Sequence, residues 1–284
     1  MRDFNSISPS AKGLLLTKAQ TTISFARKAA GIVWEQEELQ TRLDTPVTKE
    51  AWILILHFEN RYRTIDKLLF PLQTNNVLEI ASGFSFRGLQ LCTEAAVTYI
   101  DTDLPESSFV KQQVVQQIQT AEQLTLKGKL LTEPLNVLDR EAFHKVIDLF
   151  PPGPVTIINE GLLMYLDDAE KLQACRNIHE VLKQRGGSWI TGDIYIKPAE
   201  DKQQKRILSE SLEQFRKEHK IDEKKFDNYE QAEAFFISCG FTITERTTEA
   251  ADQLSALSLI PGVNVPPDVV KGWFQQRQTW KLEV

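Results

Sequence analysis

The chain of 284 residues is long enough for one large α/β domain with additions, or for two small domains. Apolar residues make up 42% of it and charged residues 25%, which is typical of a globular protein with a packed core. A net charge of −6 gives no sign of a phosphate-backbone partner, so we expect no nucleic-acid binding. The 3 cysteines and 4 histidines show no metal-ligand spacing, and we expect no metal site.

The sequence also bears on location. The first ten residues lack the apolar core of a signal peptide, and the longest apolar run, at 51–56, is too short to span a bilayer. We therefore expect a cytoplasmic protein without membrane contact. The oligomeric state stays open.

Residues 1–75 are predicted to form a helical prefix. Apolar residues recur at helical spacing over 9–30, where Gly31 suits the helix end, and again over 48–70, where Pro71 follows. Two helices before the first strand are more than a minimal nucleotide-binding domain needs. We expect this prefix to cover a ligand cleft as a lid.

From residue 76 to 284, strand and helix patterns alternate, which predicts a parallel sheet with helices on both faces. The expected strands lie at 77–81, 97–102, within 128–137, 155–159 and 188–195, and the helices between them at 86–95, 105–124, 140–150 and 167–184.

Residues 197–226 break this rhythm. They are rich in Lys, Glu and Gln, and we predict a helical insertion here, after the fifth strand. A helix at 228–238, a strand at 241–247, a short helix and a last strand at 279–284 complete the chain. Five parallel strands followed by a two-stranded hairpin predict the Rossmann-like, seven-stranded α/β sheet of class I methyltransferases.

The most informative stretch runs from Asn76 to Gly83, and a second apolar run follows it and ends at Asp103. A strand, a glycine turn, a helix and a strand ending in an acid form the first half of a nucleotide-binding unit. The acid can accept hydrogen bonds from both hydroxyls of a ribose. Only one glycine stands where a dinucleotide fingerprint has three, which favours S-adenosylmethionine over a nicotinamide cofactor. A nicotinamide-dependent oxidoreductase remains the rival from another enzyme class.

Four segments resemble the leucine carboxyl methyltransferase family, which also contains polyketide-tailoring O-methyltransferases. They are Arg61-Tyr-Arg-Thr-Ile-Asp66, Leu78-Glu-Ile-Ala-Ser-Gly-Phe-Ser-Phe-Arg87, Tyr99-Ile-Asp-Thr-Asp-Leu-Pro105 and Asn159-Glu-Gly-Leu-Leu-Met-Tyr-Leu166. The last is nearly the family's Glu-Gly-Leu-Leu-Met-Tyr-Leu and is the most specific. Two departures lie in the second segment, where Ala81 replaces the family's second loop glycine and Ser85-Phe86 replaces its Asp-Thr pair.

The resemblance implies S-adenosylmethionine as cofactor. Asp103 would bind the ribose, although it also suits a helix N-cap before Pro105, and Asp101 is the alternative ribose ligand. Glu79 or Glu160 would hold the methionine amino group. The full set of expected cofactor-binding residues is Arg61, Glu79, Ala81, Gly83, Asp103, Leu104, Asn136, Val137, Glu160 and Gly161, with Asn136 and Val137 beside the adenine.

The expected catalytic residues are Glu160, Tyr165 and Arg63, near the transferable methyl group. Arg61 and Arg63 would grip a carboxylate of cofactor or substrate, since guanidinium binds carboxylate bidentately. Lys18 is a weaker candidate for the same task.

The sequence thus predicts an S-adenosylmethionine-dependent O-methyltransferase acting on a small molecule. A carboxylate acceptor, with a pKa of about 4, needs no general base, whereas a hydroxyl would need help from His57 or Glu160. Two alternatives stay open: methylation of a protein C-terminal carboxylate, and a non-catalytic binding module on the same scaffold.

Overall fold

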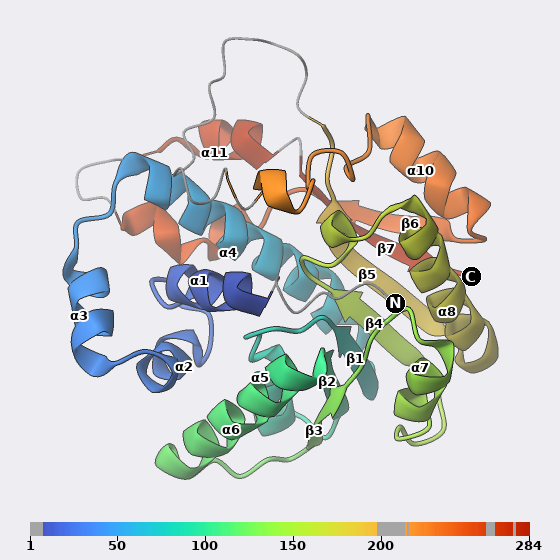
Figure 1. The fold of residues 1–284 in the computed structure, drawn as a ribbon, viewed down its shortest axis with the longest axis horizontal. Coiled ribbons are helices and arrows are strands. Elements are labelled where there is room, and N and C mark those ends of the chain that lie inside the picture. Colours follow the sequence, from blue (N-terminus) through green and yellow to red (C-terminus); the bar gives the residue numbers. More distant parts are fainter. Residues whose placement is uncertain (1–7, 198–213, 215, 260–264, 275–276) are drawn as a thin grey trace.

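A computed structural model describes residues 8–197, 214, 216–259, 265–274 and 277–284 (Figure 1). These residues contain a 7-stranded sheet in the order β3-β2-β1-β4-β5-β7-β6. The strands are β1 (Asn76–Ile80), β2 (Thr98–Asp103), β3 (Lys129–Pro134), β4 (Val155–Asn159), β5 (Gly187–Ile194), β6 (Thr242–Thr247) and β7 (Gln278–Glu283).

The sheet confirms the predicted fold class. Strands β1 to β5 pair in parallel, and β7 lies antiparallel between β5 and β6. Every residue of the central strands β1 and β4 is buried, as expected for parallel strands covered on both faces. The chain order reverses between β1 and β4. Ligands of such sheets bind at this switch point, beyond the carboxyl ends of the strands.

Helices cover both faces of the sheet (Figure 1). On one face, α7 (Arg140–Ile147), α8 (Asp168–Arg185) and α10 (Tyr229–Ser238) bury apolar side chains against the strands. On the other face lie α4 (Lys49–Leu69), α5 (Arg87–Glu94) and α6 (Pro105–Ala121). A short helix, α11 (Pro267–Phe274), packs with the first half of α4. Each of these helices lies within two or three residues of its predicted bounds where the sequence predicted one.

The prediction of one helix over 9–30 is wrong. The structure has α1 (Ser8–Lys18) and α2 (Ala26–Val33), separated by a turn, and Gly31 lies inside α2. Thr21 breaks the helix because its hydroxyl competes for backbone partners: Oγ1 donates to the carbonyl of Lys18 at 2.7 Å and accepts from the Ile23 amide at 3.2 Å. A further helix, α3 (Gln36–Asp44), was not predicted.

The second predicted helix is confirmed as α4. Its N-cap is Thr48, whose hydroxyl accepts a hydrogen bond from the Ala51 amide at 3.2 Å. Its C-terminal half is buried against the sheet through Ile65 and Leu69. Most of the predicted insertion at 197–226 lies outside the described residues, within which 216–218 are helical and 219–224 form turns. The division of the chain at residue 75 stays a prediction.

Candidate active site at the carboxyl ends of the parallel strands

The loop after β1 bends sharply through two residues with left-handed backbone. Ala81 has φ 51° and Gly83 has φ 45°. Glycine adopts this conformation freely, whereas alanine pays about 1 kcal/mol for it. The position where Ala81 replaces the family's glycine is thus one where glycine would relieve strain. The left-handed backbone is present at this position although the residue is alanine.

Asp103, the last residue of β2, closes onto this loop. Its Oδ2 accepts a hydrogen bond from the Gly83 amide, and its Oδ1 accepts one from the Leu104 amide, both at 2.7 Å. Burial raises the pKa of Asp103, and these two amides oppose that rise. The carboxylate is therefore fixed at the strand end with acceptor capacity to spare. Leu104, not Asp103, is the N-cap of α6, although no side chain caps that helix.

The second expected acid, Glu79, has its hydrogen bonds satisfied within the protein. It is 1% exposed and accepts from Arg87 Nη1 at 2.6 Å, from the Tyr99 hydroxyl at 2.6 Å and from Ser85 Oγ at 3.0 Å. Ser85 stands where the family has an acid, and here it serves as a donor to Glu79. The structure therefore makes Glu79 a support of the loop rather than a free group.

Arg87 is the center of this network and was not singled out from the sequence. It is fully buried at 0% exposure, and its Nε donates to Oδ1 of Asp66 at 2.6 Å. Its guanidinium lies 3.9 Å from the ring centroid of Tyr62. The carboxylates of Asp66 and Glu79 pair with this arginine, as a buried cation requires. The arginine at the end of the second family-like segment was the available signal.

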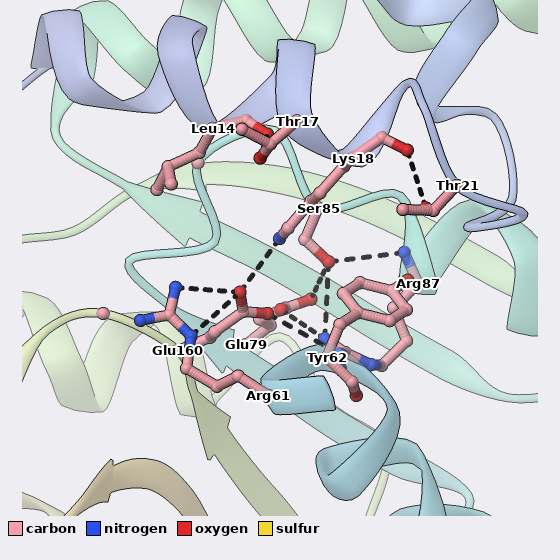
Figure 2. A network of polar contacts seen from close by, with 12 residues as sticks. Leu14, Thr17, Lys18, Thr21, Arg61, Tyr62, Glu79, Ser85, Arg87 and Glu160 are labelled. Carbon is pink, nitrogen blue, oxygen red and sulfur yellow. Dashed lines mark hydrogen bonds and ion pairs between the residues drawn. The ribbon is translucent and has the colours of Figure 1, made fainter. Parts of the chain in front are cut away.

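Glu160, directly after β4, gathers cations from the helical prefix (Figure 2). Its Oε1 lies 3.0 Å from Lys18 Nζ and 3.0 Å from Arg61 Nη2. Its Oε2 is buried, has no hydrogen-bond partner among the described residues, and lies 3.9 Å from Arg87 Nη2. Burial alone would raise the pKa of Glu160, but these three cations lower it to about 2. Glu160 is therefore an ionised acceptor with one oxygen unused.

Arg61 reaches Glu160 through a slot between two glycines. A Cβ atom built on Gly161 would lie 3.4 Å from its Nη2, and one on Gly192 would lie 3.1 Å from its Cγ. Its Nη1 donates to the hydroxyl of Tyr195, whose pKa burial raises to about 12. The two glycines leave the room that the arginine side chain needs.

The loop that carries Glu160 is held by a buried carboxylate at the end of β5. Asp193, 1% exposed, accepts from the amides of Gly161 and Leu162, both at 2.6 Å, and of Leu163 at 3.0 Å. Asn159 Nδ2 donates to the same carboxylate at 2.7 Å. Asp193 was not predicted from the sequence. Its signal is an acid inside the apolar run of the fifth expected strand.

The remaining expected residues make other contacts. Asn136 Oδ1 accepts from the Leu138 amide at 3.0 Å, and Val137 is buried in the core beside α7 and α8. Tyr165 offers its carbonyl to Lys224 Nζ at 2.7 Å. Arg63 does not join Lys18 and Arg61 at Glu160: its Nη2 donates to Thr22 Oγ1 at 3.1 Å, and its Nη1 lies 3.9 Å from Asp66.

The described residues contain neither a membrane-spanning helix nor a cluster of metal ligands. No helix there combines the length and the apolar character needed to cross a bilayer. No group of three or more His, Cys, Asp or Glu side chains in the described ranges is placed to hold a metal ion.

Comparison with known proteins identifies the fold. No family model and no curated protein matches the sequence. Among solved structures, a putative methyltransferase from Thermobifida fusca YX is 14% identical, with 95% of this chain and 92% of that chain covered at a TM-score of 0.53. Magnesium protoporphyrin IX methyltransferase from Synechocystis PCC 6803, solved with S-adenosylhomocysteine, is 10% identical over 92% of this chain and 96% of its own, with a TM-score of 0.49.

A third match, a pericyclic reaction enzyme, is 10% identical with a TM-score of 0.44, and this chain spans 55% of its length. The chain has the class I methyltransferase fold, as strand order and the Thermobifida structure agree. Membership in the leucine carboxyl methyltransferase family stays a prediction from the sequence.

Proposed function

We propose that this protein is an S-adenosylmethionine-dependent methyltransferase that transfers the methyl group to an oxygen atom. The observation that carries the proposal is the pairing of two sites at the carboxyl ends of β2 and β4. Asp103 is fixed against the glycine loop at the end of β2. The cations Lys18 and Arg61 converge on Glu160 at the end of β4. One site suits a ribose and the other the charged end of an amino acid.

The side chains fit the cofactor at each of its polar ends. Asp103 would accept from the ribose hydroxyls, and Asn136 would lie by the adenine. Lys18 and Arg61 would bind the methionine carboxylate, since both cations already hold a carboxylate at 3.0 Å. Oε2 of Glu160 would accept from the amino group, which would satisfy a buried oxygen that lacks a hydrogen-bond partner within the described part of the chain.

The acceptor we propose is the carboxylate of a small molecule. The cofactor supplies an activated methyl group on a positively charged sulfur. A carboxylate is already ionised at neutral pH, so the protein has no proton to remove. Its task is then to orient two reactants and to exclude water. The buried ion-pair network around Glu160 would hold the site in place for that task, and Tyr165 is proposed to face the acceptor.

Labelled cofactor tests this proposal. The protein is incubated with methyl-labelled S-adenosylmethionine and panels of carboxylic acids, phenols and peptides with free C-termini. Transfer to a carboxylate gives a methyl ester, which alkali hydrolyses to labelled methanol, whereas a methyl ether survives. Alkali-labile label on a small acid supports the proposal, and label on peptides alone shifts it to a protein C-terminus. Cofactor binding with no transfer to any class leaves a binding module, and no binding at all contradicts the proposal.

A further inference from the structure

A buried ion pair lies next to the loop after β1, which contains Ser82 and Gly83. Lys111 on α6 is 1% exposed and Asp101 on β2 is 0% exposed, and Nζ of the lysine lies 2.7 Å from Oδ1 of the aspartate. The same Nζ donates to Oγ of Ser82 at 2.9 Å. Desolvating two charges costs about as much as their attraction returns, so such a pair is a weak source of stability. We therefore ask which structural elements the ion pair joins.

The pair connects α6 and β2 to the loop that meets Asp103. Ser82 directly precedes Gly83, and its own amide donates to the Thr102 carbonyl at 2.8 Å. Gly83 in turn donates to the Asp103 carboxylate at 2.7 Å. Three hydrogen bonds therefore hold the loop in place at this point, and the one from Lys111 to Ser82 is the only one of these three made between two side chains.

The position of Asp101 follows from the strand period. Alternate residues of a strand face the same side, so Asp101 and Asp103 share one side of β2. Burial raises the pKa of Asp101 to about 6, and Lys111 opposes the rise. Lys111 also opposes the burial-driven rise in the pKa of Asp103. Asp101 is thus engaged by the lysine, which leaves Asp103 as the acid for the ribose.

We propose that Lys111 is a positioning residue for the cofactor: it holds the Ser82–Gly83 loop against β2 so that Asp103 and the loop backbone are set for the ribose. This inference rests on the proposed function. Lys111 does not touch the cofactor. It acts through Ser82 and through the charge that it places beside Asp101.

The experiment separates positioning from simple support of the fold. Three proteins are compared with wild type: Ser82→Ala, the double variant Asp101→Leu with Lys111→Met, and Ser108→Ala as a matched control. Ser108 lies on the same helix and donates to the carbonyl oxygens of Asp103 and Glu133 rather than to the loop. The double variant replaces the ion pair by apolar side chains of similar shape, a change that buried pairs often tolerate. Titration calorimetry with S-adenosylhomocysteine gives affinity, and urea unfolding gives stability.

We expect Ser82→Ala to raise the dissociation constant about tenfold, because the loop is no longer held against β2 for the ribose, while the urea midpoint falls only by the worth of one hydrogen bond. The double variant should unfold near the wild-type midpoint and still bind about tenfold or more weakly. Ser108→Ala should bind like wild type. Wild-type affinity in Ser82→Ala, or in a stable double variant, would overturn the role of Lys111 and leave the proposed function standing. If wild type itself does not bind, the proposed function fails and the inference fails with it.

Discussion

Nζ of Lys18 lies 3.0 Å from Oε1 of Glu160, which ties the first helix of the chain to the loop after β4. Both side chains are more than nine-tenths buried, at 8% and 5% exposure. The contact places the helical prefix directly at the switch point of the sheet. A residue near the N-terminus thereby becomes part of a site that the strands define.

Removing the carboxylate of Asp103 should weaken binding of S-adenosylhomocysteine by about 2–3 kcal/mol, because two ribose hydroxyls lose a charged acceptor. Calorimetric titration of Asp103→Ala measures this. Asp103→Asn should lose less, since its amide oxygen still accepts. Unchanged affinity in a folded Asp103→Ala protein would remove this residue from the ribose site.

Gly83→Val should abolish cofactor binding while most of the fold survives. The backbone at Gly83 has φ 45°, which a β-branched residue adopts only at a cost of about 1–3 kcal/mol. A Cβ atom there would meet only Ala11, at 3.6 Å, so the protein itself leaves room for it. The side chain would instead fill the space where a ligand approaches the loop.

Gly13→Val on α1 is the control for that substitution, since a Cβ at Gly13 meets no atom within 4 Å. It should bind the cofactor like wild type. Circular dichroism and calorimetry on both variants decide the matter. A Gly83→Val protein with a wild-type spectrum and normal affinity would make Gly83 an ordinary turn residue.

The pH dependence of cofactor affinity should show whether the charge of Lys18 contributes to binding. Burial lowers the pKa of Lys18, against the opposing charge of Glu160. The lysine therefore loses its proton at a lower pH than usual, and its attraction for a carboxylate is lost as the pH rises. Lys18→Arg keeps its charge throughout this range.

Affinity for S-adenosylhomocysteine, measured from pH 7 to 10, should fall more steeply in wild type than in Lys18→Arg. The amino group of the ligand titrates alike in both experiments, so the difference isolates residue 18. Lys18→Met should bind about tenfold or more weakly than wild type at pH 7, and this difference should narrow as the pH rises and the wild-type lysine loses its charge. Parallel curves for wild type and Lys18→Arg would show that the lysine does not hold the ligand.

Glu160 should stabilise the fold only while it is ionised. Its pKa is lowered to about 2 in the folded protein, so its contribution is full above about pH 4.5 and is lost as the pH falls toward 2. A shift of this size corresponds to roughly 3 kcal/mol. Glu160→Gln should therefore be less stable than wild type by a few kcal/mol at pH 7.

Urea unfolding of both proteins between pH 7 and 3 measures that difference. The difference in stability between them should narrow below about pH 4.5, because residue 160 of the unfolded wild-type chain takes up a proton there while the folded protein keeps the carboxylate ionised. If the difference in unfolding free energy did not change with pH, the lower stability of Glu160→Gln would come from its shape and not from the lost charge.

Much of the fold follows from local sequence signals. The strand at 155–159 was predicted to the residue, because an apolar run between a Pro turn and a polar residue leaves little choice. The prediction of a single helix over 9–30 was wrong for a physical reason. Its apolar period continues through the break, as Leu15, Ala19, Ile23 and Ala26 are all buried, so periodicity alone does not detect the Thr21 turn.

Site residues that belong to a sequence motif could be predicted. Site residues whose role depends on contacts between distant segments could not. Glu160 and Asp103 stand at strand ends, which the sequence marks. The roles of Arg87 and Asp193 depend on partners from distant segments, such as Asp66 on α4 for the arginine. Arg63 was grouped with Arg61 from sequence, yet two positions along a helix turn a side chain to another face, and it meets Thr22 instead.

The central claim is that the strand ends of this sheet bind S-adenosylmethionine through Asp103 and the Lys18–Arg61–Glu160 cluster. Calorimetric titration of the wild-type protein with S-adenosylhomocysteine, beside Asp103→Ala and with NADH as a second ligand, tests it most directly. We expect one site per chain for S-adenosylhomocysteine, weaker binding in Asp103→Ala, and no heat from NADH. Absence of binding by the wild-type protein, or binding of NADH in its place, would contradict it.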